Sequence, residues 1–148
     1  MSVNLGEAKR LVLAIDDSAV LLATIKRALE FGGFEVLTAS DPVEGVRLYK
    51  QRDNEIALVL IDYEMPVLRG DEVLEQLRCS RPDVRALLIS SCDADIAKSV
   101  LEKGFWGFIQ KPITREVLLN RVHDAINSAS PITDGTAPWS GVVRQGDP

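Results

Sequence analysis

Five short apolar segments, separated by stretches of helical periodicity, constrain the fold of this chain more than any other feature. The first of them, Leu11–Ile15, is apolar at every position, which is typical of a β-strand covered on both faces. The other four segments that we expect to form strands are 35–39, 58–62, 86–90 and 107–110. Short buried strands that alternate with helices predict an α/β fold.

The intervening stretches carry signals for the start and end of each helix. Ser18 is expected to cap the first helix, and Gly32-Gly33 to end it. Asp41, followed by a proline and then by Glu44 three residues on, predicts the start of the second helix. The fourth helix is expected from the spacing of its apolar residues, Ile96, Ala97, Val100 and Leu101. Five such units in about 120 residues predict a doubly wound parallel sheet with five helices and right-handed crossovers.

The apolar pattern also divides the chain. We expect residues 1–9 to form a flexible N-terminus, 10–128 one folded domain and 129–148 a flexible tail. Six of the last twenty residues are proline or glycine, and no apolar period continues there. A longer regulator, with an output domain beyond Pro148, remains an alternative.

Composition excludes several classes of function. The formal net charge is −5, which gives no electrostatic basis for binding nucleic acid. The longest apolar run, Ile56–Ile61, is far shorter than the ~18 residues needed to span a membrane. No signal peptide is visible, so we expect the chain in the cytoplasm. Two cysteines and a single histidine, His123, do not form a zinc pattern, and His123 is expected on a helix surface.

Polar residues follow four of the expected strands: Asp16-Asp17, Asp62, Ser90-Ser91 and Lys111-Pro112. In an open parallel sheet, ligands bind outside the carboxyl ends of the strands, so we expect these side chains to converge. An acid or a serine after a strand can instead simply cap the next helix. That alternative does not explain Lys111, because a helix N-terminus disfavours a cation.

Clustered carboxylates need positive charge beside them. Two carboxylates ~4 Å apart repel by about 4 kcal/mol at an effective dielectric constant of 20. Lys111 supplies one positive charge, and a divalent cation would supply more. A ligand set made only of oxygen favours Mg²⁺, with Mn²⁺ or Ca²⁺ as alternatives, over zinc. A carboxylate, Mg²⁺, a lysine and a hydroxyl suit phosphoryl transfer, with Asp62 as the nucleophile that becomes an aspartyl phosphate.

The segments Leu13–Ser18, Leu60–Pro66 with Gly70, Leu88–Ser91 and Phe108–Pro112 resemble the receiver domain of two-component response regulators, the CheY-like family. The resemblance covers about Arg10 to Ser128. It implies a flavodoxin-like sheet of strand order 2-1-3-4-5. It also implies that Asp62 accepts a phosphoryl group from a sensor histidine kinase or a phosphotransfer protein. Such a chain is a signalling domain that acts on no external substrate.

The resemblance assigns roles to individual residues. Asp17 is implied to bind Mg²⁺ directly and Asp16 through water, with Asp62 and the backbone carbonyl of Glu64 completing the metal site. Ser90 and Lys111 are implied to bind phosphoryl oxygens. Further implied features are a cis peptide before Pro112 and an aromatic switch at Phe108, which turns inward when Ser90 moves toward the phosphate.

The output is expected to be a phosphorylation-dependent contact with a protein target or a second copy, through the face of the fourth helix, fifth strand and fifth helix. Phe105 and Trp106 are interpreted as packing residues or, alternatively, as anchors on that face. Neither nucleic acid nor a membrane is expected as a partner.

Two other functions fit part of this set of residues. A phosphohydrolase of the haloacid-dehalogenase type would also use aspartate, a hydroxyl, lysine and Mg²⁺, but with an Asp-x-Asp pattern after its first strand. Here Asp16 and Asp17 are adjacent, and neighbours on a strand are expected to face opposite sides. A degenerate receiver that only binds partners is disfavoured because every position that the chemistry needs is filled.

Overall fold

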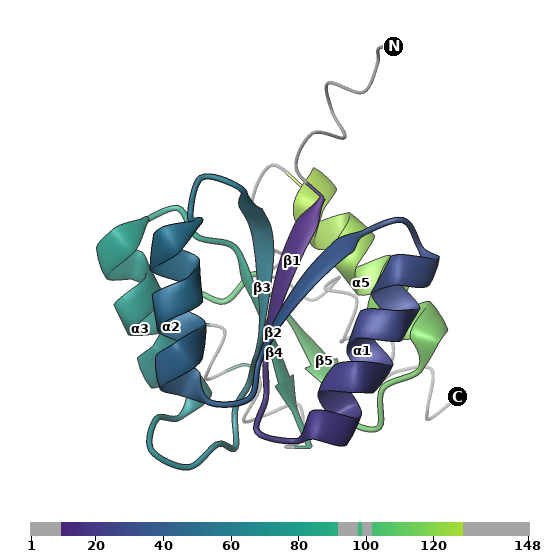
Figure 1. Cartoon of the computed structure of the whole chain (residues 1–148), viewed down its shortest axis with the longest axis horizontal. Coiled ribbons are helices and arrows are strands. Elements are labelled where there is room, and N and C mark those ends of the chain that lie inside the picture. The colour runs from purple at the N-terminus through teal and green to yellow at the C-terminus, as the bar shows by residue number, and fades with distance from the viewer. Residues whose placement is uncertain (1–9, 92–97, 99–101, 129–148) are drawn as a thin grey trace, which may run out of the picture.

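A five-stranded parallel sheet forms the centre of the computed structural model, which describes residues 10–91, 98 and 102–128. Its strands are β1 (Leu11–Ile15), β2 (Glu35–Ala39), β3 (Ile56–Asp62), β4 (Ala86–Ser90) and β5 (Gly107–Gln110). They lie side by side in the order β2-β1-β3-β4-β5, which confirms the expected topology (Figure 1).

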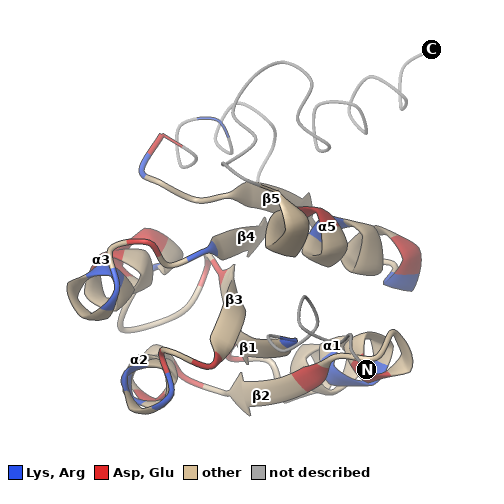
Figure 2. Ribbon diagram, turned by 90° about the horizontal axis from the view of Figure 1, so that it is seen from above, with Lys and Arg blue, Asp and Glu red and all other residues tan. Residues whose placement is uncertain are grey.

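Helices cover both faces of this sheet (Figures 1 and 2). The helices α1 (Ala19–Phe31) and α5 (Arg115–Asn127) pack on one face, and α2 (Pro42–Gln51) and α3 (Gly70–Ser80) on the other. Within the described residues the structure therefore has four helices rather than five. The expected helix with Ile96, Ala97, Val100 and Leu101 lies outside the described residues. None of the described helices is long and apolar enough to cross a membrane.

The helix boundaries follow the predicted capping signals. The Ser18 hydroxyl accepts a hydrogen bond from the Leu21 amide at 3.2 Å, and Asp41 accepts one from the Glu44 amide at 2.9 Å. At the end of α1, the Gly32 amide donates to the carbonyl of Leu29, and Gly33 adopts a φ of 92° that favours glycine. These local bonds explain why the boundaries could be predicted from sequence.

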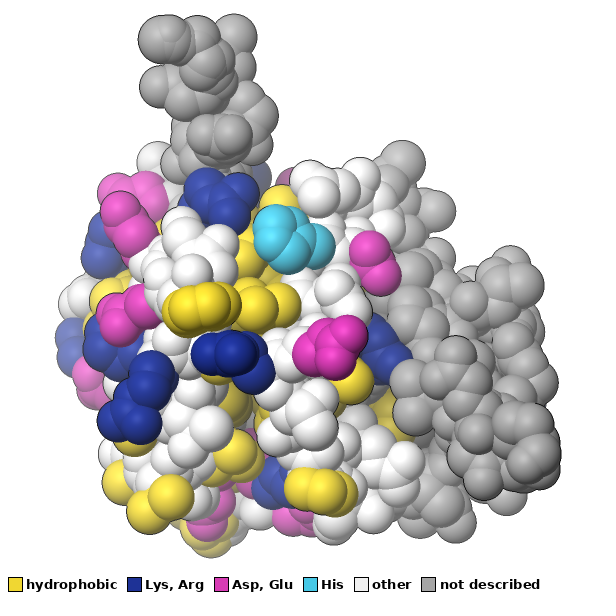
Figure 3. All heavy atoms as spheres, turned by 90° about the vertical axis from the view of Figure 1, so that its right-hand side faces the viewer, with side chains coloured by type: hydrophobic (Ala, Val, Ile, Leu, Met, Phe, Trp, Pro, Cys, Tyr) yellow, Lys and Arg dark blue, Asp and Glu magenta, His cyan; other side chains and the backbone are white. Residues whose placement is uncertain are grey.

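The face formed by α1 and α5 is turned toward the viewer in Figure 3. His123 is exposed there on α5, as predicted, and its ring lies edge-on to Phe34 with centroids 5.1 Å apart. Beneath this face, α5 contributes Leu118, Val122 and Ala125 to the apolar layer that covers the sheet.

The aromatic residues around β5 have different environments. Phe105 is 0% exposed and packs in the apolar layer beneath α2 and α3, together with Phe108 at 1%. Trp106 is partly buried in the opposite layer, with the Arg85 guanidinium 4.3 Å from its ring centroid. The interpretation of Phe105 as a surface anchor is therefore wrong, because its side chain is fully enclosed by the core.

Candidate functional site

The candidate site lies at the carboxyl edge of the sheet, where four strands end. Asp16 follows β1, Asp62 ends β3, Ser90 ends β4 and Lys111 follows β5. The hydrogen bonds between neighbouring strands extend to this edge. The Asp16 amide donates to the Ala39 carbonyl at 3.1 Å, and the Lys111 amide donates to the Ser90 carbonyl at 2.9 Å. The sheet thus brings the predicted residues to one edge. The Lys111–Pro112 peptide bond is cis.

Three carboxylates meet at this edge. One oxygen each from Asp16, Asp17 and Asp62 lie within 4.8 Å of one another, and Asp16 and Asp62 are only 1% exposed. The expectation that Asp16 and Asp17 face opposite sides is wrong, because β1 ends at Ile15 and strand alternation stops there. Asp16 instead turns into the loop, where its Oδ1 atom accepts a hydrogen bond from the Ser18 amide at 2.8 Å.

Burial is the main reason why the pKa values of Asp16 and Asp62 are raised. Burial raises the pKa of Asp16 to about 6, and repulsion from Asp62 adds to this, while the Ser18 amide opposes it. Burial also raises the pKa of Asp62, with the Lys111 ammonium opposing it and the negative charge of Glu64 adding to it. The folded chain therefore holds negative charge here at a free-energy cost.

Two buried carboxylate oxygens are positioned for a cation. Asp16 Oδ2 has no hydrogen-bond partner among the described residues. Asp62 Oδ1 lies 2.9 Å from Lys111 Nζ, an ion pair without a well-directed hydrogen bond. Buried polar atoms of this kind cost free energy unless a donor or a cation meets them. Because all the donors are oxygens, the cluster fits Mg²⁺ or Mn²⁺.

Replacing Asp16 with asparagine should stabilise the metal-free chain by about 1–2 kcal/mol at pH 7, because a buried charge is removed. Asparagine keeps an oxygen for the Ser18 amide. Between the unfolded pKa and the folded pKa of about 6, the folded wild type binds more protons than the unfolded chain. Its free energy of unfolding should therefore rise as the pH falls from 7 to 5, and less so in the variant.

The same Asp16→Asn substitution should weaken Mg²⁺ binding at least roughly tenfold, as loss of an outer partner of a metal site does. Urea unfolding followed by circular dichroism, with and without Mg²⁺, measures both effects. A variant that is less stable than the wild type without metal would contradict the unfavourable buried charge assigned to Asp16.

Ser90 and Glu64 form a contact that sequence reasoning missed. Ser90 is 0% exposed, and its hydroxyl donates a hydrogen bond to Glu64 Oε2 at 2.8 Å. The resemblance implies a role for the backbone carbonyl of Glu64, but it does not predict a bond between the Glu64 side chain and Ser90. The two residues are 26 positions apart, and no local pattern signals that their side chains meet.

The backbone carbonyl of Phe108 accepts a hydrogen bond from a buried arginine of α5. Arg121 is 8% exposed, and its Nη1 atom donates to the Phe108 carbonyl at 2.9 Å. Burial lowers the pKa of Arg121, and the carboxylate of Asp124 opposes this. Arginine is seldom buried, so Arg121 was not expected in the core, although its spacing from Leu118 and Ala125 places it on the same face of the helix.

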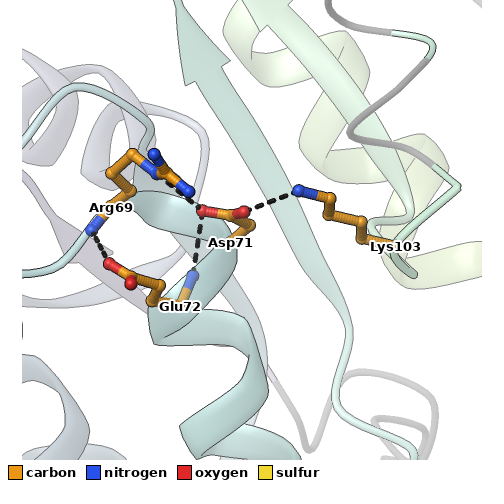
Figure 4. A network of polar contacts seen from close by, with 4 residues as sticks. All are labelled: Arg69, Asp71, Glu72 and Lys103. Atoms are coloured by element: carbon orange, nitrogen blue, oxygen red, sulfur yellow. Dashed lines mark hydrogen bonds and ion pairs between the residues drawn. The ribbon is translucent and has the colours of Figure 1, made fainter.

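A second polar network joins the start of α3 to the segment before β5 (Figure 4). Asp71 pairs with Lys103 Nζ at 2.8 Å and Arg69 Nε at 3.5 Å, and it accepts from the Glu72 amide. Burial alone would raise the pKa of Asp71, but Lys103 and Arg69 outweigh it and the pKa is lowered. The network thus links the first turn of α3 to the segment before β5 without taking part in the acid cluster.

Comparison with known proteins identifies the family. A sequence model described as the response regulator receiver domain matches residues 12–123. The chain belongs to the response regulator receiver domain family. Receiver domains are signalling domains of two-component systems that bind Mg²⁺ at an acidic pocket, and this chain has such a cluster in Asp16, Asp17 and Asp62.

Curated relatives of this receiver domain are longer proteins. Response regulator MprA of Mycobacterium leprae is 34% identical over 122 residues, which is 81% of this chain and 52% of MprA. A protein-glutamate methylesterase/protein-glutamine glutaminase of Caulobacter vibrioides is 31% identical over 140 residues, 86% of this chain and 40% of that protein. The chain thus spans about half the length, or less, of these two relatives.

Solved structures show the same fold. A receiver domain protein from Clostridium thermocellum superposes with a TM-score of 0.75 at 34% identity, covering 79% of this chain and 94% of that one. A chain of the CheX-CheY-BeF3-Mg+2 complex from Borrelia burgdorferi superposes with a TM-score of 0.75 at 30% identity, covering 80% of this chain and 90% of that one. The match to this signalling family gives no support to the phosphohydrolase alternative.

Proposed function

We propose that this receiver domain is a cytoplasmic phosphoacceptor, which takes a phosphoryl group onto Asp62 from a phosphohistidine of a sensor histidine kinase or a phosphotransfer protein. The observation that carries the proposal is the buried Asp62 carboxylate, which has Lys111 Nζ at 2.9 Å and two further carboxylates within 4.8 Å. This arrangement supplies a nucleophile, a fixed positive charge and a cation site at one point.

In the proposed reaction, a carboxylate oxygen of Asp62 attacks the phosphorus atom and forms an O–P bond. The P–N bond to the donor imidazole breaks, and the leaving nitrogen takes up a proton from water. Lys111 pairs with one phosphoryl oxygen, and the Ser90 hydroxyl donates to another. Mg²⁺, held by Asp16, Asp17, Asp62 and the Glu64 carbonyl, would neutralise phosphoryl charge when bound.

Acetyl phosphate tests this proposal without a kinase. The wild-type chain with Mg²⁺ should gain the mass of one phosphate, as acetate leaves, and excess chelator should prevent the gain. Lys111→Ala should slow labelling by roughly 100-fold, the effect of losing one donor to a transferring group. Lys103→Ala is the matched control, since Lys103 pairs with Asp71 rather than Asp62, and its rate should be unchanged. Full labelling in chelator would disprove the metal role.

The proposed output is a change in the surface around β5 and α5 that alters binding to a protein target or a second copy. The expected fourth helix, which would complete this surface, lies outside the described residues. Ser90 and Phe108 lie on adjacent strands, since β4 pairs with β5 from Leu87–Gly107 to Ser90–Gln110. A movement of Ser90 toward the phosphate would thus be transmitted directly to β5. Because Phe105 is buried, Trp106 is the aromatic of this region that remains partly exposed to a partner.

A further inference from the structure

The hydroxyl that the proposed reaction needs is already engaged in the unphosphorylated chain. Ser90 Oγ donates to Glu64 Oε2 at 2.8 Å, and Ser91 Oγ lies 3.4 Å from the same oxygen. Glu64 comes two residues after the phosphoacceptor Asp62, so its carboxylate reaches Ser90 from the loop that follows β3. The contact therefore joins the ends of β3 and β4 beside the site.

A carboxylate and a phosphoryl group would compete for this hydroxyl. Each offers a charged oxygen that accepts a strong hydrogen bond, whereas a serine hydroxyl has a single proton to donate. Ser90 is 0% exposed and ends a sheet strand, so its hydroxyl cannot exchange the carboxylate for bulk water. Glu64 is exposed, and its carboxylate can move into water. Of the two partners, Glu64 is the one that can leave.

We propose that the Glu64 side chain is a latch, which holds the Ser90 hydroxyl in the unphosphorylated chain and must release it before Ser90 can bind the phosphoryl group. The latch rests on the proposed function of Asp62 and adds a role for the side chain of Glu64, distinct from that of its carbonyl. Glu64 acts through Ser90 and is a positioning residue. By accepting the hydrogen bond of Ser90, Glu64 keeps this hydroxyl away from its phosphoryl-binding position until Asp62 is phosphorylated.

The charge of Glu64 could slow phosphorylation by a different route, simple repulsion of an anionic donor. The two routes separate in a double-mutant cycle with Glu64→Ala, Ser90→Ala and the double variant. Glu64→Gln adds a further comparison, since it removes the charge but keeps an acceptor oxygen. Glu75→Ala, on the exposed side of α3, is the control for a changed net charge.

Two measurements apply to each variant in the presence of Mg²⁺: the rate of labelling by acetyl phosphate and the dissociation constant for beryllofluoride by calorimetry. Glu64→Ala should improve both by about tenfold, which corresponds to about 1.4 kcal/mol for a released charge-assisted hydrogen bond. Glu64→Gln should give a smaller gain and Glu75→Ala none. In the Ser90→Ala background, removal of Glu64 should produce no gain, because no hydroxyl remains to be released.

The outcomes are distinguishable. An equal gain with and without Ser90 would show charge repulsion and overturn the latch, as would a Glu64→Ala chain that matches the wild type. Those results would leave phosphorylation of Asp62 intact. If neither the wild type nor Glu64→Ala, both folded by circular dichroism, gained phosphate or bound beryllofluoride, the proposed function itself would fail and the latch with it.

Discussion

An Asp62→Asn chain is expected to gain no phosphate from acetyl phosphate, even with Mg²⁺ and after long incubation. The neutral amide oxygen is a far weaker nucleophile than a carboxylate, and the substitution also removes the ion pair that Lys111 makes at 2.9 Å. We expect complete loss of labelling by mass spectrometry, rather than a slowed rate. The pKa of Asp62 is raised even though the Lys111 ion pair lowers it, so the ionised carboxylate is unfavourable in the metal-free fold, and its replacement should leave the fold intact or more stable.

Asp53→Asn is the matched control for that experiment. Asp53 lies between α2 and β3, at the amino edge of the sheet, and accepts a hydrogen bond from the Ser80 hydroxyl at 2.6 Å. Its substitution removes a carboxylate far from the acid cluster, so labelling should proceed at the wild-type rate. Labelling of Asp62→Asn at wild-type stoichiometry would instead place the acceptor on another acid of the cluster.

Phe105→Ala should lower the free energy of unfolding by about 3–5 kcal/mol, because it leaves a cavity where a fully buried ring packs. Urea unfolding of the metal-free chain, followed by circular dichroism, measures the loss. Phe105→Leu fills more of the space and should cost less, so it tests the assignment even if the alanine variant does not fold.

Phe31→Ala provides the comparison for a ring at the surface. Phe31 is 71% exposed at the end of α1, where the Arg115 guanidinium lies 4.3 Å from its ring centroid. Its loss should cost less than about 1 kcal/mol. A Phe105→Ala chain as stable as Phe31→Ala would contradict burial of Phe105 and restore its interpretation as a surface anchor.

The parts of the fold that were predicted correctly depend on local signals. The runs of apolar residues define strands buried on both faces, and Ser18 and Asp41 cap helices through bonds to amides three residues away. The convergence of Asp16, Asp62 and Lys111 followed from a general property of parallel sheets, whose carboxyl ends share one edge. Their individual roles in phosphorylation rest on family resemblance and remain proposals.

The parts that sequence reasoning missed depend on contacts between residues that are far apart in the sequence. Glu64 with Ser90 and Asp71 with Lys103 are 26 and 32 residues apart, and neither pair belongs to a periodic pattern. Phe105 precedes β5, so strand alternation could not predict which way its ring points. The expectation that Asp16 and Asp17 face opposite sides failed for a related reason, because alternation was extended past the end of β1.

Because Phe108 is already buried, inward rotation of its ring can contribute little free energy to the conformational change that would follow phosphorylation. Its ring is 1% exposed, and Arg121 donates a hydrogen bond to its carbonyl from the opposite side of the sheet. Further inward rotation would remove almost no additional apolar surface from water, so it would contribute little to a change in heat capacity. A large negative heat-capacity change on beryllofluoride binding would thus report apolar surface that is buried elsewhere, in a neighbouring loop or against a second molecule.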